Sequence, residues 1–235
     1  NDNDIVSILL SHKDIKSNKV GTNYIDNKKY KWNSLIIAIY KKQYETCQLL
    51  LSRSDINVNS ILKIEQKYIF DEVKSALYLS IENKSDNITD LLLSHQDIDV
   101  NSYLEYNAKD YSEMRKTFVL NKAFENKNQD VIKNIMNHQN IDINSESIVM
   151  TRNQDINRKE GKPIIISAIE YGNLEIFQLL LSNKNLDLSR KYIKSFSSKN
   201  KFGEEYDLIK SALQNKEILK ILFDNLIEHN PNLIP

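Results

Sequence analysis

The chain has 235 residues, and its 32 lysines and arginines are balanced by 32 aspartates and glutamates, so the formal net charge is zero. Broad electrostatic capture of nucleic acid or of an anionic membrane needs a basic surplus, and we therefore expect neither kind of partner. The one cysteine cannot form an internal disulfide, which favours a reducing compartment such as the cytoplasm. No apolar run approaches the roughly 18–20 residues that a membrane span needs.

The first ten residues, NDNDIVSILL, lack the basic segment that opens a signal peptide. They already lie inside the repeating pattern described below, so we expect the sequence to be a piece of a longer protein. Only four glycines and three prolines occur, which disfavours an all-β sandwich with many tight turns and favours helices.

Apolar triplets recur along the whole chain at a nearly constant spacing of 41 to 45 residues. The residues that end them are Leu10, Leu51, Leu93, Met136, Leu181 and Phe223. Before each triplet from the second onward lies another apolar block, joined to the triplet by a short polar link. These blocks are NSLIIAI (33–39), SALYLSI (75–81), FVLNKAF (118–124), PIIISAI (163–169) and IKSAL (209–213).

Both kinds of block carry apolar residues at helical spacing. Ile176, Leu179 and Leu180, for example, lie on one face of a helix. Two short helices joined by a tight polar link form an antiparallel hairpin. Isolated helices shorter than roughly 12–15 residues are marginal. We therefore predict that the units stack side by side, so that each one buries the apolar stripe of the next.

Each second helix is followed by an exit in which polar and apolar residues alternate, as in DIDVN (97–101). Ile98 and Val100 share one face of this exit, whereas Asp97, Asp99 and Asn101 are placed to bond local backbone amides. Histidines follow three of the second helices, and we expect them to cap helix carbonyls rather than to bind a metal. They are His12, His95 and His138.

Between each exit asparagine and the next first helix lie 14 to 18 further residues. Each such segment has two strand-like runs about a polar tip, as in ILKI–EQ–KYIF (61–70), and predicts a β-hairpin. Their aromatic residues either form a contact face or pack hairpin against hairpin, and the sequence leaves both interpretations open. Eight of the 12 tyrosines lie in these segments: Tyr24, Tyr30, Tyr68, Tyr103, Tyr106, Tyr111, Tyr192 and Tyr206.

The segment PIIISAIEYGNLEIFQLLLSNKNLDLS (163–189) is similar, almost position for position, to the ankyrin-repeat pattern TPLHxAxxxGNxEIVxLLLxxGADVN. The other units match less fully. All of them lack the Thr-Pro-x-His start and the exit glycine, and they run to about 42 residues where ankyrin repeats have about 33. Long units with Ile-Asp-Val-Asn exits resemble the asparagine-rich ankyrin proteins of some protists.

This resemblance implies an all-α, ankyrin-like solenoid with extended β-hairpin fingers. We expect a single repeat array over residues 1–235. Its expected units are residues 1–18 (partial), 19–60, 61–102, 103–145, 146–189 and a C-terminal cap, 190–235.

In ankyrin proteins the ends of the first helices line a concave groove beside the hairpins. The resemblance therefore implies that a partner contacts these positions together with the hairpin aromatics. The predicted partner-binding residues are Tyr40, Lys41, Tyr68, Phe70, Glu82, Asn83, Tyr106, Tyr111, Glu125, Asn126, Glu170 and Tyr171.

The sequence contains none of the common nucleotide-binding, zinc-protease or nucleophile motifs. Cys47 lies in the apolar stripe of a second helix, where an inert core thiol is expected. We therefore expect no enzyme, no cofactor and no metal. The expected function is a non-catalytic scaffold that binds a partner protein through the groove. The alternative is an intramolecular regulatory or structural segment of a larger protein or filamentous assembly.

Overall fold

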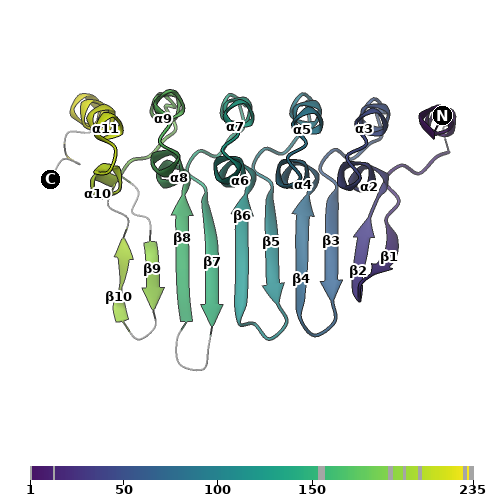
Figure 1. Cartoon of the computed structure of the whole chain (residues 1–235), viewed down its shortest axis with the longest axis horizontal. Coiled ribbons are helices and arrows are strands. Elements are labelled where there is room, and N and C mark those ends of the chain that lie inside the picture. The colour runs from purple at the N-terminus through teal and green to yellow at the C-terminus, as the bar shows by residue number, and fades with distance from the viewer. Residues whose placement is uncertain are drawn as a thin grey trace.

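The computed structural model describes residues 2–12, 14–152, 157–189, 193–197, 200–205, 208–229 and 232. Within them, two layers of helices lie above one sheet, and the units follow one another in a row (Figure 1). The helices are α1 (Asp2–Ser11), α2 (Ser34–Tyr40), α3 (Tyr44–Leu51), α4 (Ala76–Glu82), α5 (Asp86–Leu93), α6 (Val119–Asn126), α7 (Gln129–Met136), α8 (Ile164–Tyr171), α9 (Leu174–Leu181), α10 (Leu208–Ala212) and α11 (Lys216–His229). The strands are β1 (Gly21–Ile25), β2 (Lys28–Trp32), β3 (Ile61–Gln66), β4 (Phe70–Ser75), β5 (Tyr103–Ala108), β6 (Glu113–Phe118), β7 (Glu146–Arg152), β8 (Asn157–Pro163), β9 (Ile193–Ser197) and β10 (Asn200–Glu205).

The first helices of the units lie directly above the strands, and the second helices form the upper layer (Figure 1). Side chains just before two of the first helices fix where those helices begin. The side-chain oxygen Oδ1 of Asn33 accepts from the Ile36 amide at 3.1 Å, and the Ser75 hydroxyl accepts from the Tyr78 amide at 3.0 Å. Such caps satisfy amides that a helix start leaves unpaired, so these units need no Thr-Pro-x-His start.

Just beyond four of the first helices, the chain passes through a left-handed backbone conformation. The φ angles are 56° at Lys42, 53° at Lys84, 56° at Lys127 and 76° at Gly172. Only glycine adopts this conformation without a steric cost from Cβ. The one glycine among the four lies in the segment that best matches the ankyrin pattern.

The apolar triplets of the interior units contribute to the core, as predicted, whereas Ile8 and Leu9 of the first triplet are exposed. Leu92 and Leu180, at the centres of two triplets, have no exposed surface (both 0%). They belong to one hydrophobic cluster that continues from Tyr30 to Leu226. Because each helix pair covers the apolar face of the next, no unit closes a core alone.

Tyr78, on α4, is a buried ionisable group in this core. Burial is the largest cause that raises the pKa of its hydroxyl, and the negative charges of Glu82, Glu125 and Glu72 raise it further. The folded chain therefore holds Tyr78 in its neutral form well above pH 10.

In four exits, an asparagine at the end joins neighbouring units. The Asn59 side chain donates to the Asp97 carbonyl and accepts from the Asp99 amide, both at 2.8 Å. We call this pair of hydrogen bonds the asparagine bridge. Asn18, Asn101 and Asn144 make the same bridge to the exit that follows them.

The asparagine bridge corrects the prediction that Asn101 bonds local backbone. Asp99 takes that local role, because its carboxylate accepts from the Asn101 amide at 2.9 Å. In the exit of residues 185–189, serine replaces the asparagine, and the Ser189 hydroxyl donates to the Asp187 carboxylate of its own exit at 2.6 Å.

The predicted hairpins form, but they do not stand apart as fingers. Ten strands in the described residues make one antiparallel sheet in the order β1 to β10. Ile64 pairs with Glu72 inside its own hairpin and with Tyr30 of the preceding one. The predicted all-α class is therefore wrong, since the fold combines helices with a continuous sheet.

Two spacings explain why the hairpins join. Packed helices lie about 8–10 Å apart, which sets the distance between successive units. Two neighbouring strands take up about 9–10 Å in the hydrogen-bonding direction. One hairpin per unit therefore fills the unit's width, and its outer edge meets the next hairpin at hydrogen-bonding distance.

Replacing Leu92 or Leu180 by alanine removes three buried side-chain carbons, Cγ, Cδ1 and Cδ2, and leaves a cavity in the core. We expect either change to lower the free energy of unfolding by about 2–5 kcal/mol in urea titrations. Lys84→Ala, at an exposed position, serves as the control and should change it by less than about 0.5 kcal/mol. Equal, small effects at all three positions would contradict the repeat alignment.

Asn101→Ala removes both hydrogen bonds of one asparagine bridge. We expect the free energy of unfolding to fall by about 1–2 kcal/mol. Asn137→Ala, at an exposed helix end in the next unit, is the matched control and should have little effect. If the two variants melt at the same temperature, the bridge does not hold the units together.

Tyr78→Phe removes an ionisable hydroxyl whose pKa is raised in the folded chain. The stability linked to this group is fully present below about pH 10 and is lost as pH rises toward the folded pKa, since only the unfolded chain then ionises. Between pH 7 and pH 11, we expect the free energy of unfolding of wild type to fall by about 1 kcal/mol more than that of Tyr78→Phe, as measured in urea titrations. Identical losses would show that Tyr78 titrates normally.

Candidate functional site

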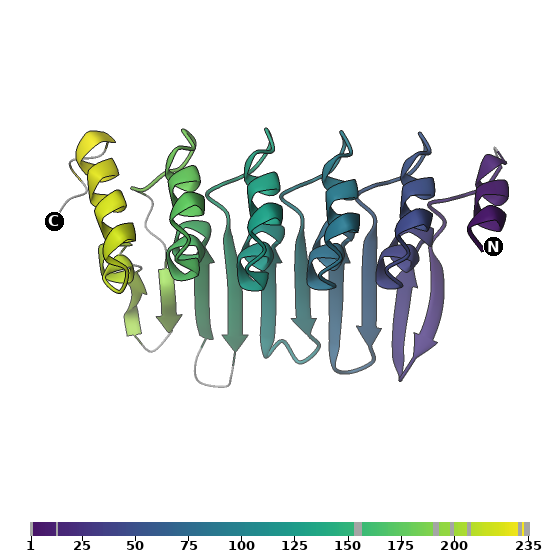
Figure 2. The same cartoon turned by 45° about the horizontal axis from the view of Figure 1, so that its top comes forward.

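Ion pairs place the ends of first helices against one face of the sheet, which we call the inner face. Lys74 on β4 donates to Glu82 at the end of α4 at 2.7 Å, and Lys162 on β8 pairs with Glu170 at the end of α8. Figure 2 shows the helices crossing in front of the upper ends of the strands, so they overhang this face. The inner corner is the angle between the inner face and the C-terminal ends of the first helices.

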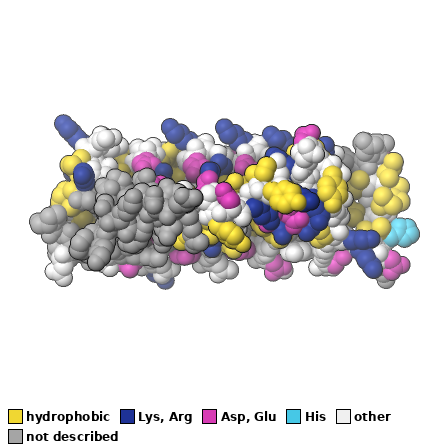
Figure 3. Space-filling model, turned by 90° about the horizontal axis from the view of Figure 1, so that it is seen from below, with side chains coloured by type: hydrophobic (Ala, Val, Ile, Leu, Met, Phe, Trp, Pro, Cys, Tyr) yellow, Lys and Arg dark blue, Asp and Glu magenta, His cyan; other side chains and the backbone are white. Residues whose placement is uncertain are grey.

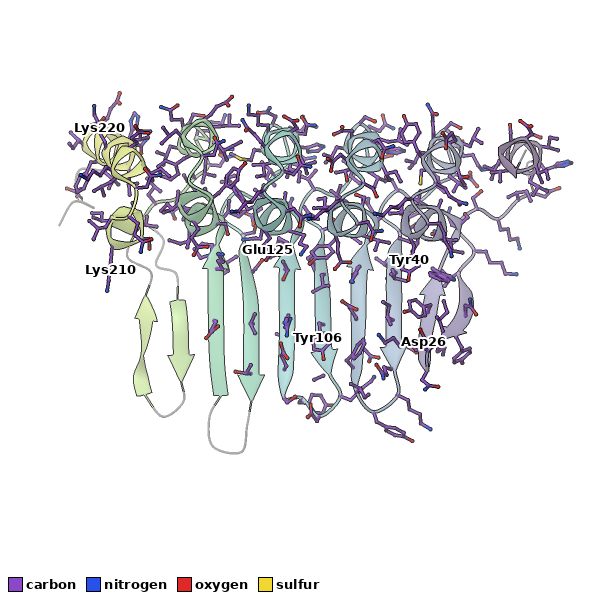
Figure 4. All side chains as sticks on the ribbon, viewed as in Figure 1. Asp26, Tyr40, Tyr106, Glu125, Lys210 and Lys220 are labelled. Atoms are coloured by element: carbon purple, nitrogen blue, oxygen red, sulfur yellow. The ribbon has the colours of Figure 1, made fainter. Side chains whose placement is uncertain are left out.

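Four predicted site residues lie along the inner corner. Tyr40 is 40% exposed and packs on Trp32 of β2, with ring centroids 5.6 Å apart. Glu82, Glu125 and Glu170 follow at the equivalent ends of α4, α6 and α8. Figure 4 shows Tyr40 and Glu125 just above the strands. The corner thus carries one aromatic ring and a spaced series of carboxylates.

The Lys74–Glu82 pair gives the inner corner fixed charges. Burial lowers the pKa of Lys74, but hydrogen bonds and attraction from Glu82 and Glu72 outweigh burial and hold this pKa above its usual value. The ammonium group therefore stays charged at neutral pH and keeps the Glu82 carboxylate in place.

Three predicted site residues hold neighbouring units together. The Asn83 side chain donates to the Ile39 carbonyl at 3.4 Å, and that of Asn126 donates to the Ile81 carbonyl at 2.6 Å. Tyr171 packs edge-on against Phe124 of the preceding unit, with ring centroids 5.9 Å apart. These three side chains therefore make contacts between units of the chain. Lys41, by contrast, is exposed to solvent.

Phe70 and Tyr106 pack against each other on the inner face, with ring centroids 5.3 Å apart. Lys28 of β2 lies 5.6 Å from the Phe70 ring centre, and Arg115 of β6 lies 5.6 Å from that of Tyr106. Cations over ring faces are attracted to them. Sequence reasoning missed Lys28 and Arg115. The Lys28 contact joins two hairpins, and the Arg115 contact depends on the strand register within its own hairpin.

Tyr68 and Tyr111 lie at the tips of two hairpins and are 79% and 77% exposed. Both adopt left-handed backbone conformations, with φ angles of 70° and 60°. Bulky residues rarely adopt this conformation, and backbone strain of this kind gathers at functional sites. Of the other predicted hairpin tyrosines, Tyr192 and Tyr206 lie outside the described residues.

The aromatic residues thus divide into two groups, which the sequence could not separate. Strand aromatics such as Phe70 and Tyr106 pack across strands on the inner face, whereas Tyr24 of β1 is 71% exposed. Those at the tips expose their rings to solvent. The hairpin aromatics therefore include both packed rings and exposed rings.

Cys47, the one residue considered as a nucleophile, is buried in the helical core and does not line the inner corner. Burial raises the pKa of the Cys47 thiol to about 12, so it stays protonated at neutral pH. In the part of the chain that the structure describes, no group of three His, Cys, Asp or Glu side chains is placed to hold a metal ion. No helix there is long and apolar enough to cross a membrane.

The prediction that the histidines cap helix carbonyls is wrong for two of them. His95 Nδ1 accepts from the Asp97 amide at 3.2 Å, and His138 Nδ1 accepts from the Asn140 amide at 3.4 Å. A serine hydroxyl bonds a last-turn carbonyl instead, as Ser94 does to Leu91 at 2.8 Å. These histidines therefore shape the turn that leads into each exit.

Comparison with solved structures finds similarity to the ankyrin repeat domain of Bcl-3, described as a unique member of the IkappaB protein family. The TM-score is 0.51 and the identity 15%, over 82% of this chain and 69% of that one. No protein-family profile and no curated protein matches the chain. At this identity the similarity concerns the fold alone, and the fold of this chain is ankyrin-like.

Proposed function

We propose that the chain is a non-catalytic protein-binding module, whose contact surface is the inner corner together with the exposed strand tips. The observation that carries this proposal is the joined sheet, because it turns the separate units into one uninterrupted inner face beneath the row of first helices. Repeat arrays bind through such extended surfaces, where many modest contacts act together.

Exposed aromatic rings supply the main contacts in this proposal. Tyr40 lies in the inner corner, and Tyr68 and Tyr111 lie at the tips. Tyrosine is enriched among the residues that dominate binding energy, since it buries a large area with few rotatable bonds. The left-handed backbone at the two tips sets the direction of each Cα–Cβ bond.

The carboxylates of Glu82, Glu125 and Glu170 recur once per unit along the inner corner. Each of them pairs with a lysine, which is Lys74, Lys122 or Lys162, so the row offers a partner a repeated pattern of ion pairs. Asn83, Asn126 and Tyr171 act indirectly in this proposal, since they hold the units in register.

A structural role in an assembly built end to end is the second candidate. Ile5, Ile8 and Leu9 on α1 are 59%, 65% and 50% exposed, and every residue of β1 is exposed. The helix and the strand edge together offer a surface for another unit.

The test begins with photo-crosslinking in a native lysate, using a benzophenone amino acid at Tyr40 or Tyr111, and identification of the captured protein. The affinity of that purified protein is then measured for wild type and for Tyr40→Ala, Tyr68→Ala and Tyr111→Ala. We expect the most central of these changes to cost about 2 kcal/mol or more, roughly 30-fold in affinity.

Lys133→Ala and Gln178→Ala on second helices are the controls, and they should leave the affinity unchanged. Loss of binding confined to these controls would place the contact on the helical side and end the proposal. Head-to-tail association of the purified chain, seen by analytical ultracentrifugation and abolished by Ile8→Asp, would favour the structural candidate.

A further inference from the structure

Three lysines converge on one carboxylate on the outer face of the sheet, opposite the inner corner. The ammonium groups of Lys31, Lys63 and Lys29 lie 2.8, 3.0 and 3.5 Å from the Glu65 carboxylate. We call these four residues the lysine cluster. Lys31 and Lys63 are directly opposite each other in the register of β2 and β3. Like charges in such a pair repel each other unless an anion lies between them.

The lysine cluster has more positive charge than it can neutralise. Hydrogen bonds from Lys31 and Lys63 hold the pKa of Glu65 at about 2, so its carboxylate is fully ionised at neutral pH. One negative charge against three positive charges leaves a surplus of two. Asp71, the next carboxylate across the sheet, already pairs with Lys109. The surplus is therefore available to an anion from outside the chain.

A cavity of about 520 Å³ opens beside the lysine cluster at the strand tips. Lys29 and Glu65 line it together with Tyr24 and Tyr68. Lys67 adds positive charge, and the Lys109–Asp71 ion pair completes the lining. Seen from the strand tips, basic and hydrophobic side chains gather around acidic ones toward the N-terminal end of the sheet (Figure 3). An occupant of this cavity would meet ammonium groups and aromatic rings at once.

The spacing of the charges favours an extended chain over a small ion. Lys31 and Lys63 form one level across the strands, and Lys29 lies at the next level toward the tips. Successive levels on one face of a sheet are about 6.8 Å apart, because each residue rises about 3.4 Å. Alternate side chains of an extended peptide repeat at the same distance.

We propose that the outer face at the tips of the first two hairpins binds an extended acidic peptide segment. Two carboxylates at alternate positions of the segment lie at the two levels of the lysine cluster. An aromatic or aliphatic side chain that follows them fills the cavity between Tyr24 and Tyr68. The lysine cluster lies on the face opposite the inner corner, so the two proposals share Tyr68 but otherwise depend on different residues.

Nucleic acid fits this surface less well. The described lysines here are interleaved with Glu65 and Asp71, which would repel a continuous phosphate backbone. No arginine lines the cavity, although arginine is the residue best matched to phosphate. A peptide with spaced carboxylates places its charges only where the lysines are.

The probe is fluorescein-labelled Gly-Glu-Ser-Glu-Ser-Phe-Gly, with a version that has glutamine for both glutamates as its control. Fluorescence anisotropy at low salt measures the binding of both to the whole chain. We expect the glutamine peptide and the Lys31→Gln/Lys63→Gln variant each to weaken binding about tenfold. Added salt should weaken the binding of the glutamate peptide, since exposed charges are screened.

Two further variants separate charge recognition from loss of folding. Glu65→Gln removes the internal competitor and should tighten peptide binding, although it leaves three lysines unpaired and so lowers stability. Lys216→Gln/Lys220→Gln on α11 makes the same change in net charge at exposed positions and should bind like wild type. Tyr40→Ala, in the inner corner, should also bind like wild type.

Equal binding of the glutamate and glutamine peptides would overturn the proposal, as would equal losses in the two double-lysine variants. Weaker binding by Glu65→Gln would also overturn it, because the carboxylate would then belong to the recognition surface. If single-stranded oligothymidine binds as tightly as the glutamate peptide and depends on the same lysines, the surface recognises polyanions and not an acidic peptide.

Discussion

An asparagine side chain fixes each repeat to the next by donating to one backbone carbonyl and accepting from one backbone amide of the following exit. Both partners are backbone groups, so the bridge places the next unit without depending on its other side chains. Four successive asparagines make it, and each therefore imposes nearly the same displacement on the unit that follows. The hydrophobic core supplies most of the stabilisation, but apolar contacts are non-directional and tolerate sliding. The asparagine bridge fixes the position of each unit relative to the next.

The constant displacement has consequences for the whole sheet. A hairpin is as wide as the helix pair above it, so neighbouring hairpins share hydrogen bonds along their edges. Among the described strands, β1 and β10 are the outermost, so most strand edges of the array are paired inside the sheet, which limits the surface open to unwanted strand pairing. Joining the hairpins also divides their side chains between two faces. Phe70 and Tyr106 pack on the inner face beneath the first helices, whereas Lys31 and Lys63 meet on the outer face. One ankyrin-like array thus presents two surfaces of different chemistry.

Periodicity in the sequence was enough to predict the helices, the core position of Leu92 and the presence of hairpins, because these depend on contacts within one unit or on a pattern repeated in all of them. The all-α class was wrong because pairing between hairpins depends on the distance between units, which no single segment encodes. Asn101 was assigned a local role for a similar reason: its partners lie 39 and 41 residues away. The exposure of residues near the hairpin tips could not be predicted from the sequence either. Tyr68 and Phe70 are two residues apart in one hairpin, yet only the fold shows that one is exposed and the other packs on Tyr106.

If the asparagine bridge sets the spacing of the array, the amides that it engages should be protected although they lie in exposed turns. Amide hydrogen exchange followed by NMR tests this directly at Asn57, Asp99, Asp142 and Asp187. The account predicts that Asp99 and Asp142, in the middle of the array, exchange nearly as slowly as the helices that they join. Exchange at these amides at the rate of an unfolded chain would contradict it and would leave the hydrophobic core as the sole link between units.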